Sequence, residues 1–204
     1  MINKEFIRVL EERSSIREFD KSIEISESEL SEILALATKA PSAWNLQHWK
    51  FLVVKSEESK QKLLPIAFNQ KQVLDASATI VVLGNLKAND NAPKIYNPIV
   101  DAGFMTKEYK DKLISDINNV YTVDERAKSS AILNSSLAAM QFMLAAKASG
   151  WDTCPMTGFN HELLVKEFNI DNGFIPVIII PIGKAAAPSY PTTRLPINDV
   201  TEWI

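Results

Sequence analysis

The scarcity of glycine is the feature of this sequence that most restricts its fold. The chain of 204 residues has six glycines, and the closest two, Gly150 and Gly158, lie eight positions apart. Dinucleotide folds built on G-x-G-x-x-G and nucleotide folds built on G-x-x-x-x-G-K-[ST] need glycines two to five positions apart. Neither motif can occur here, so a phosphate would have to be held by side chains and scattered backbone amides.

The composition predicts a single globular domain over residues 1–204. Hydrophobic residues make up 46% and charged residues 23%, and one core can serve a chain of this length. With 22 basic and 25 acidic residues the net charge is −3, which argues against a nucleic-acid partner. There is no apolar signal core at the start, and the stretch 176–183 is far shorter than the roughly 20 residues that cross a bilayer. We therefore expect a cytoplasmic protein without a membrane segment.

Cysteine and histidine are too few for most metal sites. The single Cys154 and the two histidines, His48 and His161, exclude a disulfide framework and a multi-histidine cage, so we expect no metal. Cys154 and His161 could form a nucleophile and base, but a buried, inert thiol is the favoured interpretation. We expect both histidines at the surface or in turns.

Apolar spacing predicts more helix than strand and no regular βαβ alternation, which indicates the α+β class. The helix 124–149 is apolar on two sides, a pattern typical of the centre of a fold or of a subunit interface. The tail 185–204 is interrupted by prolines but apolar, so we expect it to cover another surface. Further helices are expected at 2–12, from Ser26 to before Pro41, at 57–66, 70–76, 99–119 and 161–168, strands at 49–54, 79–83 and 177–182, and a loop at 85–97.

Arg13 and Arg17 lie four residues apart, with Ser14 and Ser15 between them. At the end of a helix, this spacing places two guanidinium groups and two hydroxyls around one point, which suits a phosphate. The alternative is a set of surface arginines paired with the neighbouring glutamates. Two further cations would complete a pocket if the tail folded back: Lys184 and Arg194.

The loop from Pro41 to Gln47 combines hydroxyl, amide and aromatic groups between two buried elements. Such a loop can hydrogen-bond a polyol or the edge of a heterocycle. It can equally be a turn that satisfies its own hydrogen bonds, with Trp44 inserted in the core. The residues alone leave both interpretations open.

Read in order, these segments resemble the nitroreductase family of FMN enzymes over almost the whole chain. Each motif alone is weak, and their common register makes the resemblance strong. It implies an α+β fold with a central mixed or antiparallel sheet flanked by helices, in an intertwined homodimer with exchanged C-terminal tails. The motifs are Arg13–Phe19, Ala40–Phe51, Phe68–Asn69 ahead of Leu74–Ala76, Pro155–Phe159, and Gly183–Lys184 followed by Arg194–Pro196.

The resemblance also implies how FMN is bound. Arg13, Ser15 and Arg194 would hold the phosphate, with help from Lys184. Arg17 would lie at the N1/O2 edge of the flavin ring, Asn69 at the N3/O4 edge, and the amides of Thr157 and Gly158 at N5. The full expected set is Arg13, Ser14, Ser15, Arg17, Asn69, Gln72, Pro155, Met156, Thr157, Gly158, Lys184 and Arg194, with Pro41, Ser42, Ala43 and Asn45 reaching the cofactor from the partner subunit.

The implied activity is the reduction of nitroaromatics, quinones or similar small acceptors with NADPH or NADH. Hydride transfer would pass through flavin N5 in ping-pong order, tuned by Arg17, Thr157 and Gly158, without a protein nucleophile. Two alternatives stay open: a flavin-binding protein for storage or sensing, and a specialised dehydrogenase or dehalogenase of the same family.

Three positions depart from the family pattern. His48 stands where proline is usual, Gln72 where some members have lysine, and Thr157 where an acidic residue or glycine is common. The segment 104–121 corresponds to the variable substrate lid. Its candidates for gating aromatic residues are Phe104, Tyr109 and Tyr121.

Overall fold

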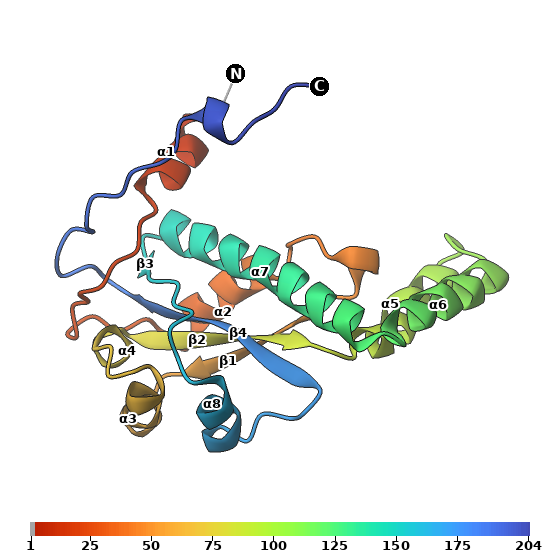
Figure 1. Ribbon diagram of the computed structural model, residues 1–204, viewed down its shortest axis with the longest axis horizontal. Helices are drawn as coiled ribbons and strands as arrows, with labels where there is room; N and C mark the ends of the chain where they lie inside the picture. The colour runs from red at the N-terminus through yellow and green to blue at the C-terminus, as the bar shows by residue number, and fades with distance from the viewer. Residues whose placement is uncertain (1–2) are drawn as a thin grey trace.

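A computed structural model describes residues 3–204, and its centre is a four-stranded sheet (Figure 1). The strands lie in the order β1-β2-β4-β3, and each neighbouring pair is antiparallel. The α+β class is confirmed, and of the two sheet types that the sequence allows, the chain has the antiparallel one. The strands are β1 (Trp49–Val54), β2 (Ala78–Asn85), β3 (Asp152–Thr153) and β4 (Phe174–Gly183).

Eight α-helices are found among residues 3–204: α1 (Lys4–Glu12), α2 (Glu27–Ala37), α3 (Glu57–Ile66), α4 (Gln72–Asp75), α5 (Ala92–Asp101), α6 (Lys107–Tyr121), α7 (Asp124–Ala148) and α8 (His161–Glu167). Three short 3-10 turns are η1 (Ala43–Asn45), η2 (Ala88–Asn91) and η3 (Ile197–Asp199). Helices α2 and α7 cover one face of the sheet, and α3, α4 and α8 cover the other (Figure 1).

Alternate residues of β2 belong to two separate apolar layers. Ile80 and Val82 pack with α2 and α7, whereas Val81 and Leu83 pack with α3 and α8. This alternation follows from the two-residue period of a strand. Because both faces are covered, the strand is apolar at nearly every position, as the sequence indicates for residues 79–83.

Local sequence signals locate several helix ends correctly. Ser26 and Glu29 form the expected capping box, in which each side chain accepts a hydrogen bond from the other residue's backbone N–H at 3.1 Å. Helix α7 ends at Ala148, and Gly150 follows with φ +77°, a conformation that favours glycine. The expected helix 2–12 is present from Lys4, and Ile2 lies outside the described residues.

The region after β2 differs from the prediction. Residues 85–97 were expected as a loop and 99–119 as one helix, but η2 and α5 occupy the first part. The chain then breaks at Gly103, which has φ +75°, and α6 begins after the N-cap Thr106. Pro93 lies in the first turn of α5, where its missing N–H breaks no helical hydrogen bond.

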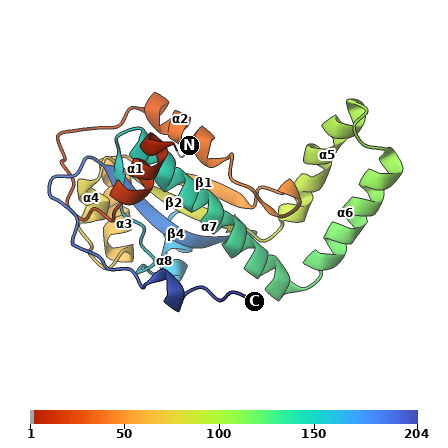
Figure 2. The same ribbon diagram turned by 90° about the horizontal axis from the view of Figure 1, so that it is seen from above.

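Helices α5 and α6 form an arm that projects from the body (Figure 2). A third apolar cluster stabilises its base, with Ala88, Ala92, Tyr96 and Ile117 buried against Leu46. This tertiary burial, between segments 40 or more residues apart, explains why a local proline signal failed to predict the helix. We refer to residues 92–121 as the α5–α6 arm.

Several large apolar side chains stay exposed on the single chain. In the outer stripe of α7, Leu133, Leu137 and Met140 are 62%, 42% and 40% exposed. Helix α1 has no buried residue. Within residues 3–204, no helix combines the length and apolarity that a membrane span needs. The tail adds six large exposed apolar residues: Tyr190, Leu195, Ile197, Val200, Trp203 and Ile204.

His48 is fully buried, so its expected position at the surface or in a turn is wrong. Its Nε2 lies 2.7 Å from the Tyr121 hydroxyl, and its carbonyl accepts a hydrogen bond from Asn85 N at 2.6 Å. Its Nδ1 has no hydrogen-bond partner among the described residues. Burial lowers the pKa of His48 from 6.5 to about 4.

We predict that acidification destabilises the fold through His48. Between pH 6.5 and pH 4 the unfolded chain binds a proton at this residue and the folded chain does not, so stability falls as the pH falls. The full loss is about 3 kcal/mol. Urea unfolding at several pH values should show this component in the wild type and not in His48→Gln. Equal pH dependence in both proteins would contradict it.

Candidate functional site

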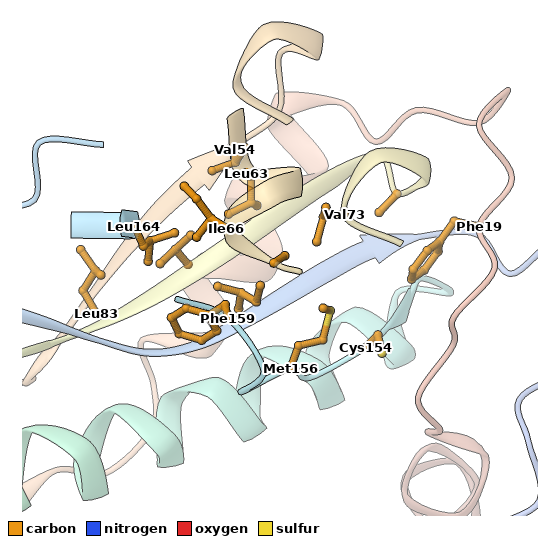
Figure 3. Close-up of a cluster of buried hydrophobic side chains, with 14 of the residues drawn as sticks. Phe19, Val54, Leu63, Ile66, Val73, Leu83, Cys154, Met156, Phe159 and Leu164 are labelled. Atoms are coloured by element: carbon orange, nitrogen blue, oxygen red, sulfur yellow. The ribbon is translucent and has the colours of Figure 1, made fainter. Parts of the chain in front are cut away.

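Three segments that carry predicted site residues meet on the sheet face covered by α3, α4 and α8. They are residues 13–19, 67–73 and 155–159, and each places apolar side chains in one buried cluster (Figure 3). Among the anchors, Figure 3 shows Phe19, Val73, Met156 and Phe159. The cluster fixes the three segments relative to one another and leaves most of their polar residues at least partly accessible, Gln72 being buried.

Residues 13–19 form an extended edge next to β3. Ile16 N donates to the Thr153 carbonyl at 3.0 Å, and Ser15 pairs with Thr153 in parallel. Phe19 pairs with Ala185 beyond the end of β4. Ile16 and Phe19 are buried, while the side chains of Arg13 and Ser15 stay partly accessible. The predicted phosphate-binding residues are therefore held on an ordered backbone.

The second and third segments contact each other directly. Gln70 Nε2 donates to the carbonyls of Gly158 at 2.8 Å and Ala67 at 3.0 Å. Asn160 N donates to the Ile66 carbonyl at 2.8 Å. These bonds bring the exposed Asn69 to the same part of the molecule as the Gly158 loop. Gln72 is buried, and its Nε2 donates to Gln70 Oε1 at 3.4 Å.

The amides of Thr157 and Gly158 are available to a ligand. Met156 N donates to the Ile179 carbonyl at 2.8 Å, and Phe159 N donates to the Thr157 carbonyl at 3.1 Å. Within residues 3–204, the two N–H groups between them donate no hydrogen bond. Both residues are exposed. They provide two backbone donors beside the polar face of the site.

Arg13 and Arg17 form no ion pair with a carboxylate in the part of the chain described. The alternative of arginines neutralised by neighbouring glutamates is therefore not realised. The Arg17 guanidinium lies 5.9 Å from the centroid of the Tyr190 ring. Burial raises the pKa of the Cys154 thiol, and the positive charge of Arg17 partly opposes this. Cys154 is the buried thiol that the sequence favoured.

In the single chain, the side chains of Lys184 and Arg194 donate hydrogen bonds to backbone carbonyls. The Lys184 ammonium donates to the Gly150 carbonyl and lies 4.3 Å from the centroid of the Trp151 ring. It thus caps the end of α7, a contact that the sequence did not reveal. Arg194 Nη1 donates to the carbonyl of Thr193 at 2.8 Å, on the exposed tail. The phosphate-binding roles of both residues stay predictions.

The loop Pro41–Gln47 lies far from residues 13–19 in the same chain (Figures 1 and 2). Ala43 N donates to Asn134 Oδ1 at 2.8 Å, and Asn134 lies near the middle of α7. From Asn134 to its end at Ala148, α7 covers about 20 Å at 1.5 Å per residue. Ser15 pairs with Thr153, which follows that end of the helix. Trp44 is 38% exposed, so its insertion in the core is excluded.

Comparison with known proteins identifies the family of this arrangement. The sequence pattern of the nitroreductase family matches residues 10–184. YodC of Bacillus subtilis, named as an NAD(P)H nitroreductase, is 50% identical over 196 residues, covering 96% of this chain and 97% of YodC. The CLA biosynthesis enone reductase of Lactiplantibacillus plantarum is 32% identical over 209 residues, covering 100% of this chain and 96% of that protein.

Solved structures agree with the sequence matches. A nitroreductase of Exiguobacterium sibiricum, crystallised in complex with FMN, superposes with a TM-score of 0.91. It is 39% identical, and the superposition covers 100% of this chain and 99% of that one. The likeness thus includes every segment of the candidate site.

We predict that Lys184→Met lowers the free energy of unfolding by about 1–2 kcal/mol, because it removes the bond to Gly150 and the contact with Trp151. Urea unfolding of the protein without added ligand measures this. Lys112→Met, which changes an exposed lysine on α6, is the matched control. A Lys184 variant as stable as that control would show that the ammonium does not cap α7.

Proposed function

This chain belongs to the nitroreductase family, and we propose that it is an FMN-dependent oxidoreductase that takes electrons from NADPH or NADH. Its acceptors are nitroaromatics, quinones or similar small molecules. The observation that carries the proposal is the meeting of unpaired arginines, serine hydroxyls and free backbone amides above one buried cluster. The relative from Exiguobacterium sibiricum, with FMN bound, supports the choice of cofactor.

The donors present fit FMN. Arg13, Ser14 and Ser15 supply a guanidinium and two hydroxyls for a phosphate, which carries about −1.5 to −2 charges. They replace the glycine-rich loop that the sequence excludes. The free N–H groups of Thr157 and Gly158 suit an acceptor atom of a ring, and the amide of Asn69 suits a ring edge that has both a donor and an acceptor.

The protein's part in the reaction is to hold and polarise the cofactor. When bound, FMN supplies the redox chemistry by accepting a hydride at N5 and passing two electrons to an acceptor. Arg17 stabilises the negative charge that develops at the N1/O2 edge, since a fixed guanidinium needs little reorganisation. The nicotinamide and the acceptor use the site in turn, in ping-pong order. No nucleophilic side chain is required.

A homodimer completes each site. Pro41, Ser42, Ala43 and Asn45 lie against the middle of α7, about 20 Å along the helix from the end near Arg13, so a second copy must bring them to the cofactor. The exposed stripe of α7 and the apolar tail supply the surface for this contact. Contiguous apolar patches of this kind mark interaction sites on soluble proteins. We place the tail of each subunit across the other.

We predict that Leu137→Asp produces a monomer that no longer retains FMN, because a carboxylate would be buried in the interface. Analytical ultracentrifugation gives the mass, to be compared with 22.8 kDa for one chain, and absorbance gives the FMN content. Leu163→Asp changes a 49% exposed leucine on the opposite side of the sheet and should stay dimeric. A dimeric, FMN-loaded Leu137 variant would rule out this interface.

Anaerobic stopped-flow reduction tests the function. The FMN-loaded protein should bleach rapidly with NADPH or NADH and recover its colour with nitrofurazone or menadione. No bleaching favours storage or sensing. Recovery of the colour with only one class of acceptor indicates a specialised enzyme of the family. An α,β-unsaturated ketone should be tested as a third acceptor, because one relative is named an enone reductase.

Arg17→Ala should slow this reduction about tenfold to a hundredfold while the dimer and its FMN are kept, because one stabilising charge is lost. Arg126→Ala, an exposed arginine at the start of α7, is the control. Reduction at the wild-type rate in the Arg17 variant would remove this residue from the mechanism.

A further inference from the structure

The loop from Ser42 to Gln47 has an unusual backbone. Trp44, Asn45 and Gln47 have φ of +52°, +54° and +53°, in the left-handed region that residues with side chains seldom adopt. Three such residues within four positions persist only where the surroundings hold them. This is also the loop that carries the predicted contacts from one subunit to its partner's cofactor.

The body of the fold holds the two ends of this loop: Ala43 N donates to Asn134 Oδ1 at 2.8 Å, and Asn85 N donates to the carbonyl of His48, the residue after the loop, at 2.6 Å. Within the loop, Gln47 N donates to Ser42 Oγ at 3.0 Å. The carbonyls of Trp44 and Leu46 take no part in these bonds. Their partners come from another element.

The α5–α6 arm and the turn before it supply these partners, one at every second residue. The Tyr96 hydroxyl donates to the Trp44 carbonyl at 2.7 Å, and Asn91 Nδ2 donates to the Leu46 carbonyl at 2.9 Å. The third contact joins the Tyr121 hydroxyl to His48 Nε2 at 2.7 Å.

The three contacts are partly buried. Tyr96 is buried, Leu46 is fully enclosed, and His48 is inaccessible. Burial raises the pKa of Tyr121 to about 12 and also raises that of Tyr96. Both hydroxyls therefore keep their proton at neutral pH. Hydrogen bonds in such surroundings cannot be replaced by water without rearrangement.

We propose that Tyr96, Asn91 and Tyr121 are positioning residues, through which the α5–α6 arm and the turn before it hold the loop Ser42–Gln47 in the shape that receives the partner's FMN. On this proposal, the base of the arm and the turn before it set the geometry of a cofactor-binding loop. The inference rests on the proposed function. It assigns no chemical step to the three side chains.

Hydrogen exchange of the ligand-free protein tests the holding role without any activity measurement. In Tyr96→Phe, Asn91→Ala and Tyr121→Phe, amides in residues 42–47 should exchange about three- to tenfold faster, the effect of losing one hydrogen bond. Exchange in β2 and β4 should stay unchanged. Asn97→Ala is the control, because it removes only the 3.0 Å bond from Lys110 inside the arm. A uniform rise that includes β2 and β4, or no rise in the loop, overturns the proposal.

Titration with FMN, followed by quenching of flavin fluorescence, tests the consequence. The three variants should bind about three- to tenfold more weakly than the wild type, and Asn97→Ala should bind equally well. Equal affinity in all variants overturns the inference while the proposed function stands. A wild type that binds no FMN contradicts the proposed function instead, and the exchange result is independent of it. If Tyr96→Phe fails to fold, Asn91→Ala carries the test, since Asn91 is only partly buried.

Discussion

The fold depends on one buried apolar cluster between the sheet and the helices α3, α4 and α8. Ile16 and Phe19 anchor the arginine-bearing segment in it, Val73 anchors the turn after α3, and Met156 and Phe159 anchor the loop with the free amides. Because the apolar residues of three separate segments share one layer, the polar residues between them face outward together. Hydrophobic burial thus assembles a set of donors that no single stretch of sequence contains.

The same chain carries the remaining predicted cofactor contacts against the middle of α7, about 20 Å along that helix from the arginine-bearing segment. The loop Pro41–Gln47 is fixed there by Asn134 and by the base of the α5–α6 arm. In the proposed homodimer, the loop of one copy completes the site of the other, and a two-fold pair completes two sites at once. The exposed apolar stripe of α7 and the exposed tail have a common explanation in this arrangement.

The sequence predicted those features that local patterns determine. The capping box at Ser26 and the long helix α7 are confirmed, and so are the family and the antiparallel alternative for the sheet, which the resemblance implied. Features set by contacts between distant residues were missed. Burial of Tyr96 and Ile117 turns a proline-containing stretch into helix, and the Tyr121 contact encloses His48, which looked like a turn residue. Lys184 was expected at a phosphate, but its bond to Gly150 could not be read from spacing.

Complementation between two defective variants tests the central claim, that two subunits build each FMN site. Arg13→Glu should abolish FMN binding because it changes a phosphate-binding residue. Ser42→Glu should abolish it because it changes the loop that contacts the partner's FMN. Each variant alone should be dimeric and colourless. When the two are unfolded together and refolded, mixed dimers contain one intact site, so the account predicts that FMN binding returns in the mixture. A mixture that dimerises and stays colourless would contradict it, as would a single variant that retains its flavin.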